Sequence, residues 1–371
     1  MKKLTKILLI CLALLLGRAL GILSGMALSR IPGLSITGEL GLHLLVLLML
    51  YVFYLVGVIL HEAGHLVFGL ATGWRFVSFR IRSVVWIRSA DGSIRRGRLT
   101  VPGTAGQCLL APPPGRKDDY PYQLYNMGGV IMNLLTAVIF GLLAVIFWSR
   151  PLAALLLMEA ALVGLFMALS NGLPLRGPVN NDGRNHYFLR QSADARRALR
   201  IELSAAAAEA EGKCLREMPD KWFKPFPEAA MDNPLIASIA VLAAERKLDA
   251  FDLAGAEADI RALLARDEGL TMLSKAALTI DGAFCELVGG HPGDLCEALG
   301  SPAYRRILKS MRRSLSLLRT RYAEALLKNN DEALAQEYLE AFEEAAEDYP
   351  YPQNIEFERQ AMALAREAKN P

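Results

Sequence analysis

The most constraining feature of this chain is an almost uncharged stretch that leads directly into two histidines. The twenty residues from Gly41 to Leu60 contain one ionisable side chain, His43, and the next five residues are His61-Glu62-Ala63-Gly64-His65. A stretch of this length and polarity predicts a helix that spans a bilayer. Ionisable groups near such a span are costly unless they are paired or bind a metal, so this segment predicts a functional site.

The spacing of the two histidines indicates a metal site. Residues i and i+4 lie on one face of a helix, so His61 and His65 can bind one zinc ion while Glu62 acts as a base on water. A chance match or a solvated helix face is the alternative, but neither suits three polar side chains that follow an apolar span. We therefore expect His61 and His65 to be metal ligands, Glu62 to be catalytic and Zn2+ to be the cofactor.

Hydropathy predicts a membrane domain in the first half of the chain. Of the 371 residues, 53% are hydrophobic, and the mean hydropathy of +0.26 is too high for an ordinary soluble globule. The first apolar stretch follows Met1-Lys2-Lys3 and resembles a signal peptide, but it exceeds the usual apolar core of about 7–15 residues, so we expect an uncleaved helix. The four expected transmembrane helices are 5–28, 41–70, 127–148 and 152–171.

Basic residues predict the orientation in the membrane. The segment 73–126 contains nine Lys and Arg residues, whereas the loops 29–40 and 149–151 carry one each, Arg30 and Arg150. Because cytoplasmic loops are enriched in Lys and Arg, we expect a multi-pass protein of the cell membrane with both termini in the cytoplasm. The nine residues are Arg75, Arg80, Arg82, Arg88, Arg95, Arg96, Arg98, Arg116 and Lys117.

The two halves of the chain differ in charge and in pattern. Residues 1–183 carry 16 Lys and Arg and 7 Asp and Glu, net +9, which suits a lipid bilayer with anionic lipids; residues 184–371 carry 25 and 31, net −6. We therefore expect a membrane-embedded domain at 1–188 and an all-helical cytoplasmic domain at 189–371 with a surface for a protein partner, and no nucleic-acid partner. Stacking of its helices as in tetratricopeptide arrays is one interpretation. Its expected helices lie near 192–215, 228–246, 249–266, 270–288, 302–328 and 331–347.

The spacing of the hydrophobic residues changes from helical to alternating within the apolar first half of the chain. Between Trp74 and Val101 the side chains alternate, and Asp91-Gly92 supplies a turn, so we expect a cytoplasmic β-hairpin at 74–101, followed by a glycine-rich bend at 102–108. The hairpin is either a structural flap or an edge strand that pairs with an extended substrate. The apolar face would carry Val77, Phe79, Ile81, Val85 and Ile87, and the polar face Arg80, Arg82 and Arg88.

Two charged residues lie within the expected spans. Arg18 is in the first and Glu159 in the fourth, and at a rise of 1.5 Å per residue their depths in the bilayer coincide. They either form a pair or meet water and head groups separately.

A catalytic zinc ion requires a third protein ligand. Asp182 is the sole carboxylate in the stretch 171–183 that follows the fourth span, and His186 is the second candidate. An exposed loop histidine is the plainer interpretation of His186.

The histidine motif, with Asn171-x-x-Pro174 and Asp182-Gly183, resembles the site-2 protease family of intramembrane zinc metallopeptidases over about residues 41 to 183. The resemblance implies that Asp182 is the third zinc ligand. It also matches Gly129-x-x-x-Asn133, whose asparagine is thought to hold the substrate backbone, so Gly129, Asn133, Asn171 and Pro174 are candidate substrate-binding residues. Asn181 departs from the family, which commonly has an apolar residue there.

The resemblance implies a metalloendopeptidase that hydrolyses a peptide bond in or near a transmembrane segment, as in regulated intramembrane proteolysis. The substrate would be a membrane protein or a peptide. The alternative is a catalytically silent membrane scaffold whose helical domain binds partners, although the intact Glu62 argues against it. A transporter finds little support, because no inverted repeat is visible among four helices.

Overall fold

The computed structural model describes residues 2–30, 35–115, 120–175, 177, 179–266 and 268–369. The contacts divide the chain into two compact units. The first comprises Met1–Gly73, Pro121–Arg176 and Asn180–Tyr187, and the second comprises Trp74–Tyr120, Gly177–Val179 and Phe188–Pro371. The β-rich segment is thus grouped with the C-terminal helices. Arg116 and Lys117, two of the nine basic residues, lie outside the described residues.

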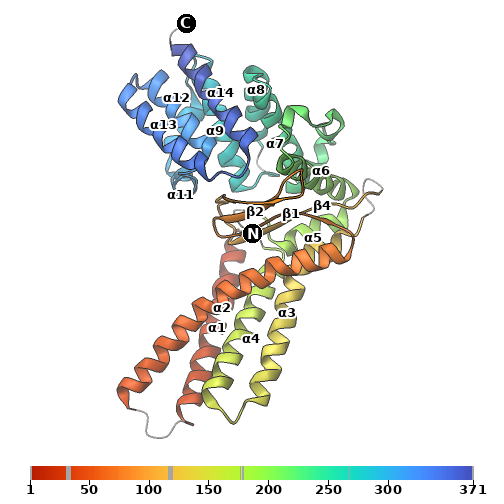
Figure 1. The fold of residues 1–371 in the computed structure, drawn as a ribbon, viewed down its shortest axis with the longest axis vertical. Helices are drawn as coiled ribbons and strands as arrows, with labels where there is room; N and C mark the ends of the chain where they lie inside the picture. Colours follow the sequence, from red (N-terminus) through yellow and green to blue (C-terminus); the bar gives the residue numbers. More distant parts are fainter. Residues whose placement is uncertain are drawn as a thin grey trace. The chain divides into compact units, whose positions relative to one another are not determined.

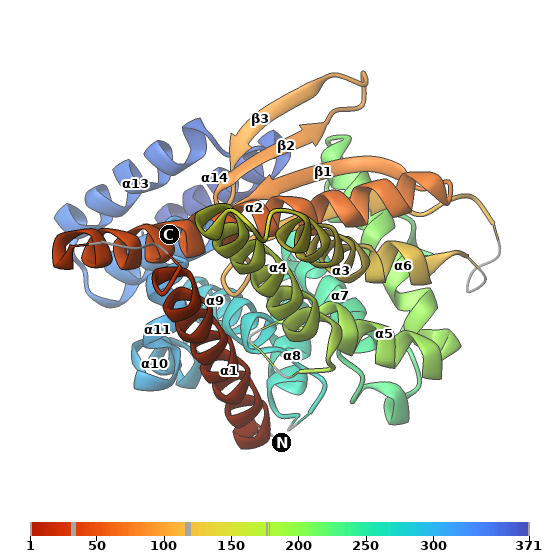
Figure 2. The same cartoon turned by 90° about the horizontal axis from the view of Figure 1, so that it is seen from below.

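Four long helices form most of the first unit (Figures 1 and 2): α1 (Lys2–Leu28), α2 (Ile36–Ala71), α3 (Tyr122–Ile146) and α4 (Pro151–Gly172). Helix α3 packs along both α2 and α4, and α1 packs against α4. All four are long and apolar enough to cross a membrane. Their outer faces expose large apolar side chains, as lipid-facing helices do and water-soluble bundles do not: Leu14, Leu15, Leu44, Leu47, Val138, Leu142 and Ile146.

The four expected spans are confirmed as helices, with α2 longer than expected. It begins at Ile36 because the Ser35 hydroxyl accepts a hydrogen bond from the Gly38 backbone and Glu39 lies in the first turn, where a negative charge is favourable. At 36 residues the helix is about 54 Å long. It is therefore longer than a hydrocarbon core of about 30 Å.

Of the two alternatives for Arg18 and Glu159, the ion pair is not formed. Glu159 is fully buried in α4 and neither of its carboxylate oxygens has a hydrogen-bond partner, whereas Arg18 is exposed on α1. Equal depth along two helices does not bring side chains together unless the helices also face each other at those positions.

A four-stranded antiparallel sheet replaces the expected two-stranded hairpin. Its strands are β1 (Arg75–Ile81), β2 (Val84–Arg88), β3 (Ile94–Arg98) and β4 (Gly106–Ala111), in the order β3-β2-β1-β4. The expected turn at Asp91 is present. The Oδ1 atom of Asp91 accepts hydrogen bonds from the backbone N–H and the hydroxyl of Ser93. The expected bend at 102–108 ends in β4, which pairs with β1 and completes the sheet.

The expected distribution of side chains over β1 is wrong: Phe79 and Ile81 lie opposite Trp86 and Val84 on one face, and Arg80 lies on the other. In the β1–β2 register Arg80 lies opposite Val85, and directly opposed residues share a face. Arg80 is 1% exposed, on the face that also buries Val85 and Ile87. Its guanidinium is accommodated because it donates to the carbonyls of Arg82 at 2.6 Å and Gly106 at 3.2 Å and to the Thr104 hydroxyl.

The rest of the second unit is helical (Figure 1), and α6 packs against β1 and β4. Helix α5 (Asp182–Gln191) leads into it from the first unit. The helices that follow are α6 (Ala193–Ala210), η1 (Leu215–Glu217), η2 (Asp220–Trp222), η3 (Glu228–Ala230), α7 (Pro234–Asp249), α8 (Leu253–Leu264), α9 (Met272–Val288), α10 (Asp294–Gly300), α11 (Pro302–Ser310), α12 (Leu315–Ala323), η4 (Glu324–Lys328), α13 (Glu332–Glu347) and α14 (Pro352–Lys369).

This helical region differs from the expected pattern at several elements. The expected helix at 302–328 is divided into α11 and α12, because the chain turns at Met311 before the helix resumes after Ser314. Helices α5 and α10 were not expected, nor was the last helix, α14. Helix α14 follows Tyr349-Pro350-Tyr351, which is typical of a loop, and begins at Pro352, a residue that suits the first turn of a helix.

Candidate metal centre

Helix α2 carries two buried histidines. His61 and His65 are 7% and 8% exposed, and the centroids of their rings are 4.9 Å apart. Helices α2 and α3 approach closely here because Gly64 faces Gly128: a Cβ atom on Gly128 would lie 2.6 Å from the Gly64 carbonyl oxygen. Glu62 is also buried, at 8% exposure. The motif therefore lies in the interior of the helical bundle.

Asp182 is the first residue of α5, and two asparagines position its backbone. The Asn181 amide donates to the carbonyls of Ser170 at 2.8 Å and Leu173 at 2.6 Å, which ties the start of α5 to the end of α4. Its Oδ1 accepts a hydrogen bond from the Arg184 backbone, as an N-cap does. Asn126 of α3 donates to the Asp182 carbonyl at 2.9 Å. Asp182 is thus held by both neighbouring helices.

The two histidines and Asp182 converge on one point. Asp182 Oδ2 lies 3.0 Å from His61 Nε2 and 3.4 Å from His65 Nε2, and the two Nε2 atoms are 3.3 Å apart. A tetrahedral zinc ion with bonds of about 2.0–2.1 Å holds its ligand atoms about 3.3 Å from one another. The three side chains therefore have the spacing, as well as the chemistry, of a metal ligand set. Within the described part of the chain they form the only such group of three.

Hydrogen bonds orient both imidazole rings. His65 Nδ1 lies 2.7 Å from the Tyr125 carbonyl oxygen, which can only accept, so Nδ1 carries the proton and Nε2 keeps its lone pair. His61 Nδ1 lies 3.0 Å from the Asn133 side-chain amide, whose Oδ1 is buried without a partner. When the nitrogen and oxygen of the Asn133 amide are exchanged, its Oδ1 accepts a hydrogen bond from His61 Nδ1. The imidazole proton of His61 then lies on Nδ1, and the lone pair of Nε2 is free to bind a metal ion.

Gly129 provides the space for the His61 ring. A Cβ atom on Gly129 would lie 2.5 Å from two atoms of that ring, Cε1 and Nε2. Any larger residue at this position would displace His61 from Asp182. Gly129 and Asn133, expected from the resemblance to contact substrate, thus both lie against a candidate ligand, and Asn133 is fully buried.

The other expected residues lie outside the group of three. Asn171 donates to the Met167 carbonyl of its own helix at 3.0 Å, and Pro174 is exposed in the segment between α4 and α5. His186, the second candidate for the third ligand, is on α5 but does not join His61, His65 and Asp182 among the described residues.

Electrostatics favour an ionised Asp182. Burial alone would raise the pKa of its carboxyl, but His65 and His61, when protonated, hold that pKa well below its usual range through their charge and hydrogen bonds, and a bound cation would take the place of those protons. An anionic oxygen and two imidazole lone pairs that face one another form a site for a cation.

Comparisons with known proteins give no relative for this chain: no family model matches it, and no characterised protein or solved structure is similar to it. The site itself is therefore the basis on which a function can be assigned.

Proposed function

We propose that this chain is an intramembrane zinc metalloprotease of the site-2 protease type. The observation that carries the proposal is the convergence of His61, His65 and Asp182 at ligand spacing inside a bundle of apolar helices. Three protein ligands leave one position of a tetrahedral zinc site open, as catalytic sites require and structural sites do not.

The residues of the chain can be assigned roles in peptide hydrolysis. Zinc at this site would polarise the scissile carbonyl and lower the pKa of a water molecule to about 7. The Glu62 carboxylate would take a proton from the attacking water, whose oxygen would form the new bond to the carbonyl carbon. The same carboxyl would then return the proton to the amide nitrogen as the carbon–nitrogen bond breaks.

The position of the site suggests the class of substrate. His61 and Glu62 are in a helix whose outer face is apolar, so a transmembrane segment of another protein is the substrate that can reach them from the bilayer. A helical peptide bond is shielded by its own hydrogen bonds, and the substrate therefore has to unwind locally before cleavage. The C-terminal helices would then select partners or control access.

Metal content tests the ligand assignment. Replacing His61 or His65 by alanine should lower zinc affinity by about 100-fold or more, since even an outer-sphere change costs about 10–100-fold. Asp182→Asn should have a smaller effect, because the amide oxygen can still coordinate but carries no charge. The measurement is zinc stoichiometry on the purified full-length protein.

Two histidines serve as controls for this series. His43 is exposed on the same helix, and His43→Ala should retain the metal. His186→Ala should also retain it. Full zinc content in Asp182→Ala would contradict the assignment and make His186 the next residue to test. Zinc binding without cleavage of any membrane protein by the unmodified chain would favour the scaffold alternative.

Orientation is part of the same proposal, with the basic 73–126 segment and both termini in the cytoplasm. After replacement of the five native cysteines, a cysteine at Ser35 should react with an impermeant thiol reagent on intact cells, and one at Ser93 should react only after lysis. Both serines are exposed in the structure, so accessibility within the protein does not limit either reaction. Labelling at Ser93 in intact cells would reverse the orientation.

A further inference from the structure

The second unit contains a pocket with a strongly basic lining. Its volume is about 270 Å3, and it lies between α6 and the segment that contains η2. Four cationic side chains line it, Arg197 and Arg200 from α6 and Lys221 and Lys224 from the facing segment. The rest of the lining is Ile201, Ser204 and Trp222.

The charge in this pocket has no acidic partner in the part of the chain that the structure describes. Among the described residues, no carboxylate forms an ion pair with any of the four cations. Arg200 Nη1 is buried and has no hydrogen-bond partner, although a buried charged donor without an acceptor is costly. Four uncompensated cations in a half of the chain with net charge −6 indicate a site for an anion.

Both guanidinium groups are held in place without acidic residues. Arg200 donates from Nη2 to the Pro113 carbonyl at 2.8 Å, and its guanidinium lies 5.3 Å from the centre of the Tyr120 ring. Arg197 lies 4.9 Å from the centre of the Phe226 ring. Aromatic contacts orient an arginine and leave its charge available to a ligand.

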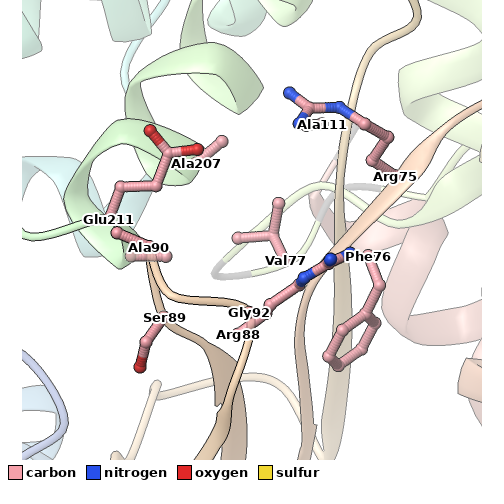
Figure 3. A pocket seen from close by; sticks show the side chains of 11 residues that line it. Arg75, Phe76, Val77, Arg88, Ser89, Ala90, Gly92, Ala111, Ala207 and Glu211 are labelled. Carbon is pink, nitrogen blue, oxygen red and sulfur yellow. The ribbon is translucent and has the colours of Figure 1, made fainter.

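A second pocket of this unit gives a useful contrast (Figure 3). It has a volume of about 110 Å3 and lies between the sheet and α6, where Arg75 and Arg88 share the lining with Glu211. This pocket has a carboxylate in its lining, whereas the described lining of the basic pocket has none. The same unit thus provides two arginines that line a pocket together with a carboxylate and can serve as a control.

We propose that the basic pocket binds a phosphate group carried on an organic ligand. The arginines have the fork of donors that suits phosphate oxygens, and the two lysines add charge at the rim. Trp222 and Ile201 offer an apolar surface to the organic part of the ligand. Such a group can come from a soluble phosphorylated molecule or from the head group of a phospholipid, and the two sources share the same recognition chemistry.

Binding to the purified full-length protein in detergent tests this proposal, by calorimetry with two probes, pyrophosphate and a short-chain phosphatidate. We expect saturable binding of at least one. The double change Arg197→Gln and Arg200→Gln should weaken it by about tenfold or more, because charge-assisted hydrogen bonds are lost. The matched control, Arg75→Gln with Arg88→Gln, should leave the dissociation constant unchanged.

Arg200 also contacts Pro113 and Tyr120, so replacing it can disturb the fold as well as the pocket. A second variant separates these two effects. Lys221 and Lys224 are exposed, so Lys221→Gln with Lys224→Gln should weaken binding and leave the helical circular dichroism unchanged. Comparable binding of both probes assigns a soluble phosphorylated ligand, and binding of phosphatidate alone assigns a lipid. No binding of either probe, or equal weakening by the Arg75 and Arg88 control, would overturn the proposal.

Discussion

Peptide hydrolysis is expected to fall by about 10²- to 10⁴-fold when Glu62 is replaced by glutamine, which is the usual contribution of a general base. Glutamine has the size of glutamate but cannot take a proton from water at neutral pH. Glu62 is not one of the three side chains that converge at ligand spacing. The zinc content of Glu62→Gln should therefore equal that of the unmodified protein while its activity is lost.

The experiment needs a substrate and a matched control. A single-span protein that accumulates in membranes of cells with Glu62→Gln is the candidate substrate, and its cleavage by the purified protein gives the rate. Glu39 lies on the same helix but is exposed at its first turn, so Glu39→Gln should cleave normally. Unchanged cleavage by Glu62→Gln would assign the base elsewhere, and loss of zinc would make Glu62 a ligand.

The histidine pair could be predicted from sequence because its geometry is local. A helix places residues i and i+4 on one face whatever surrounds it, so His61 and His65 needed only a helix. The anchors of Asp182 have no such pattern. Asn126 reaches Asp182 from 56 positions away, and Asn181 departed from the expected residue type although it caps α5. Buried amides that bond distant carbonyls are visible only in three dimensions.

The sheet shows how a local pattern can mislead. Alternation assigned Arg80 to the polar face, because a charged side chain is normally exposed. A register shift between Phe76 and Ser78 changes which residues of β1 face inward, so Val77 joins the core formed by Val85 and Ile87. Arg80 is then buried on the same side, and carbonyls outside its own strand accept its hydrogen bonds. Alternation cannot reveal a bulge or those acceptors.

Replacing Arg319 by methionine is expected to destabilise the helical region by about 3–5 kcal/mol, the usual cost of breaking a buried ion pair. Arg319 is fully buried on α12. It bonds Asp281 of α9 at 2.6 Å and Glu358 of α14 at 3.0 Å, and it lies 4.3 Å from the centre of the Phe284 ring. Methionine fills part of the volume but leaves two buried carboxylates without a cation.

The same contacts predict how the loss of stability in Arg319→Met depends on pH. Burial raises the pKa of Glu358 to about 7 and also raises that of Asp281, and Arg319 opposes both shifts. Without Arg319 both values rise further above those of the unfolded chain, near 4. The folded variant then holds protons that the unfolded chain has released, so the contribution of these two carboxyls to its stability is greatest at low pH and falls as pH rises. The loss in free energy of unfolding caused by Arg319→Met should therefore be small near pH 5 and largest near pH 8.

Thermal unfolding followed by circular dichroism measures this effect on the full-length protein. The midpoint for Arg319→Met should fall by about 10 °C near pH 8, from the size of the loss and a helical region of this length. Arg313 is a matched control because it forms an exposed pair with Glu344, and Arg313→Met should cost less than about 1 kcal/mol. Adding Asp281→Asn and Glu358→Gln to Arg319→Met removes the stranded charges and should restore part of the loss. Equal midpoints for the Arg319 and Arg313 variants would show that the buried charges do not hold α9, α12 and α14 together.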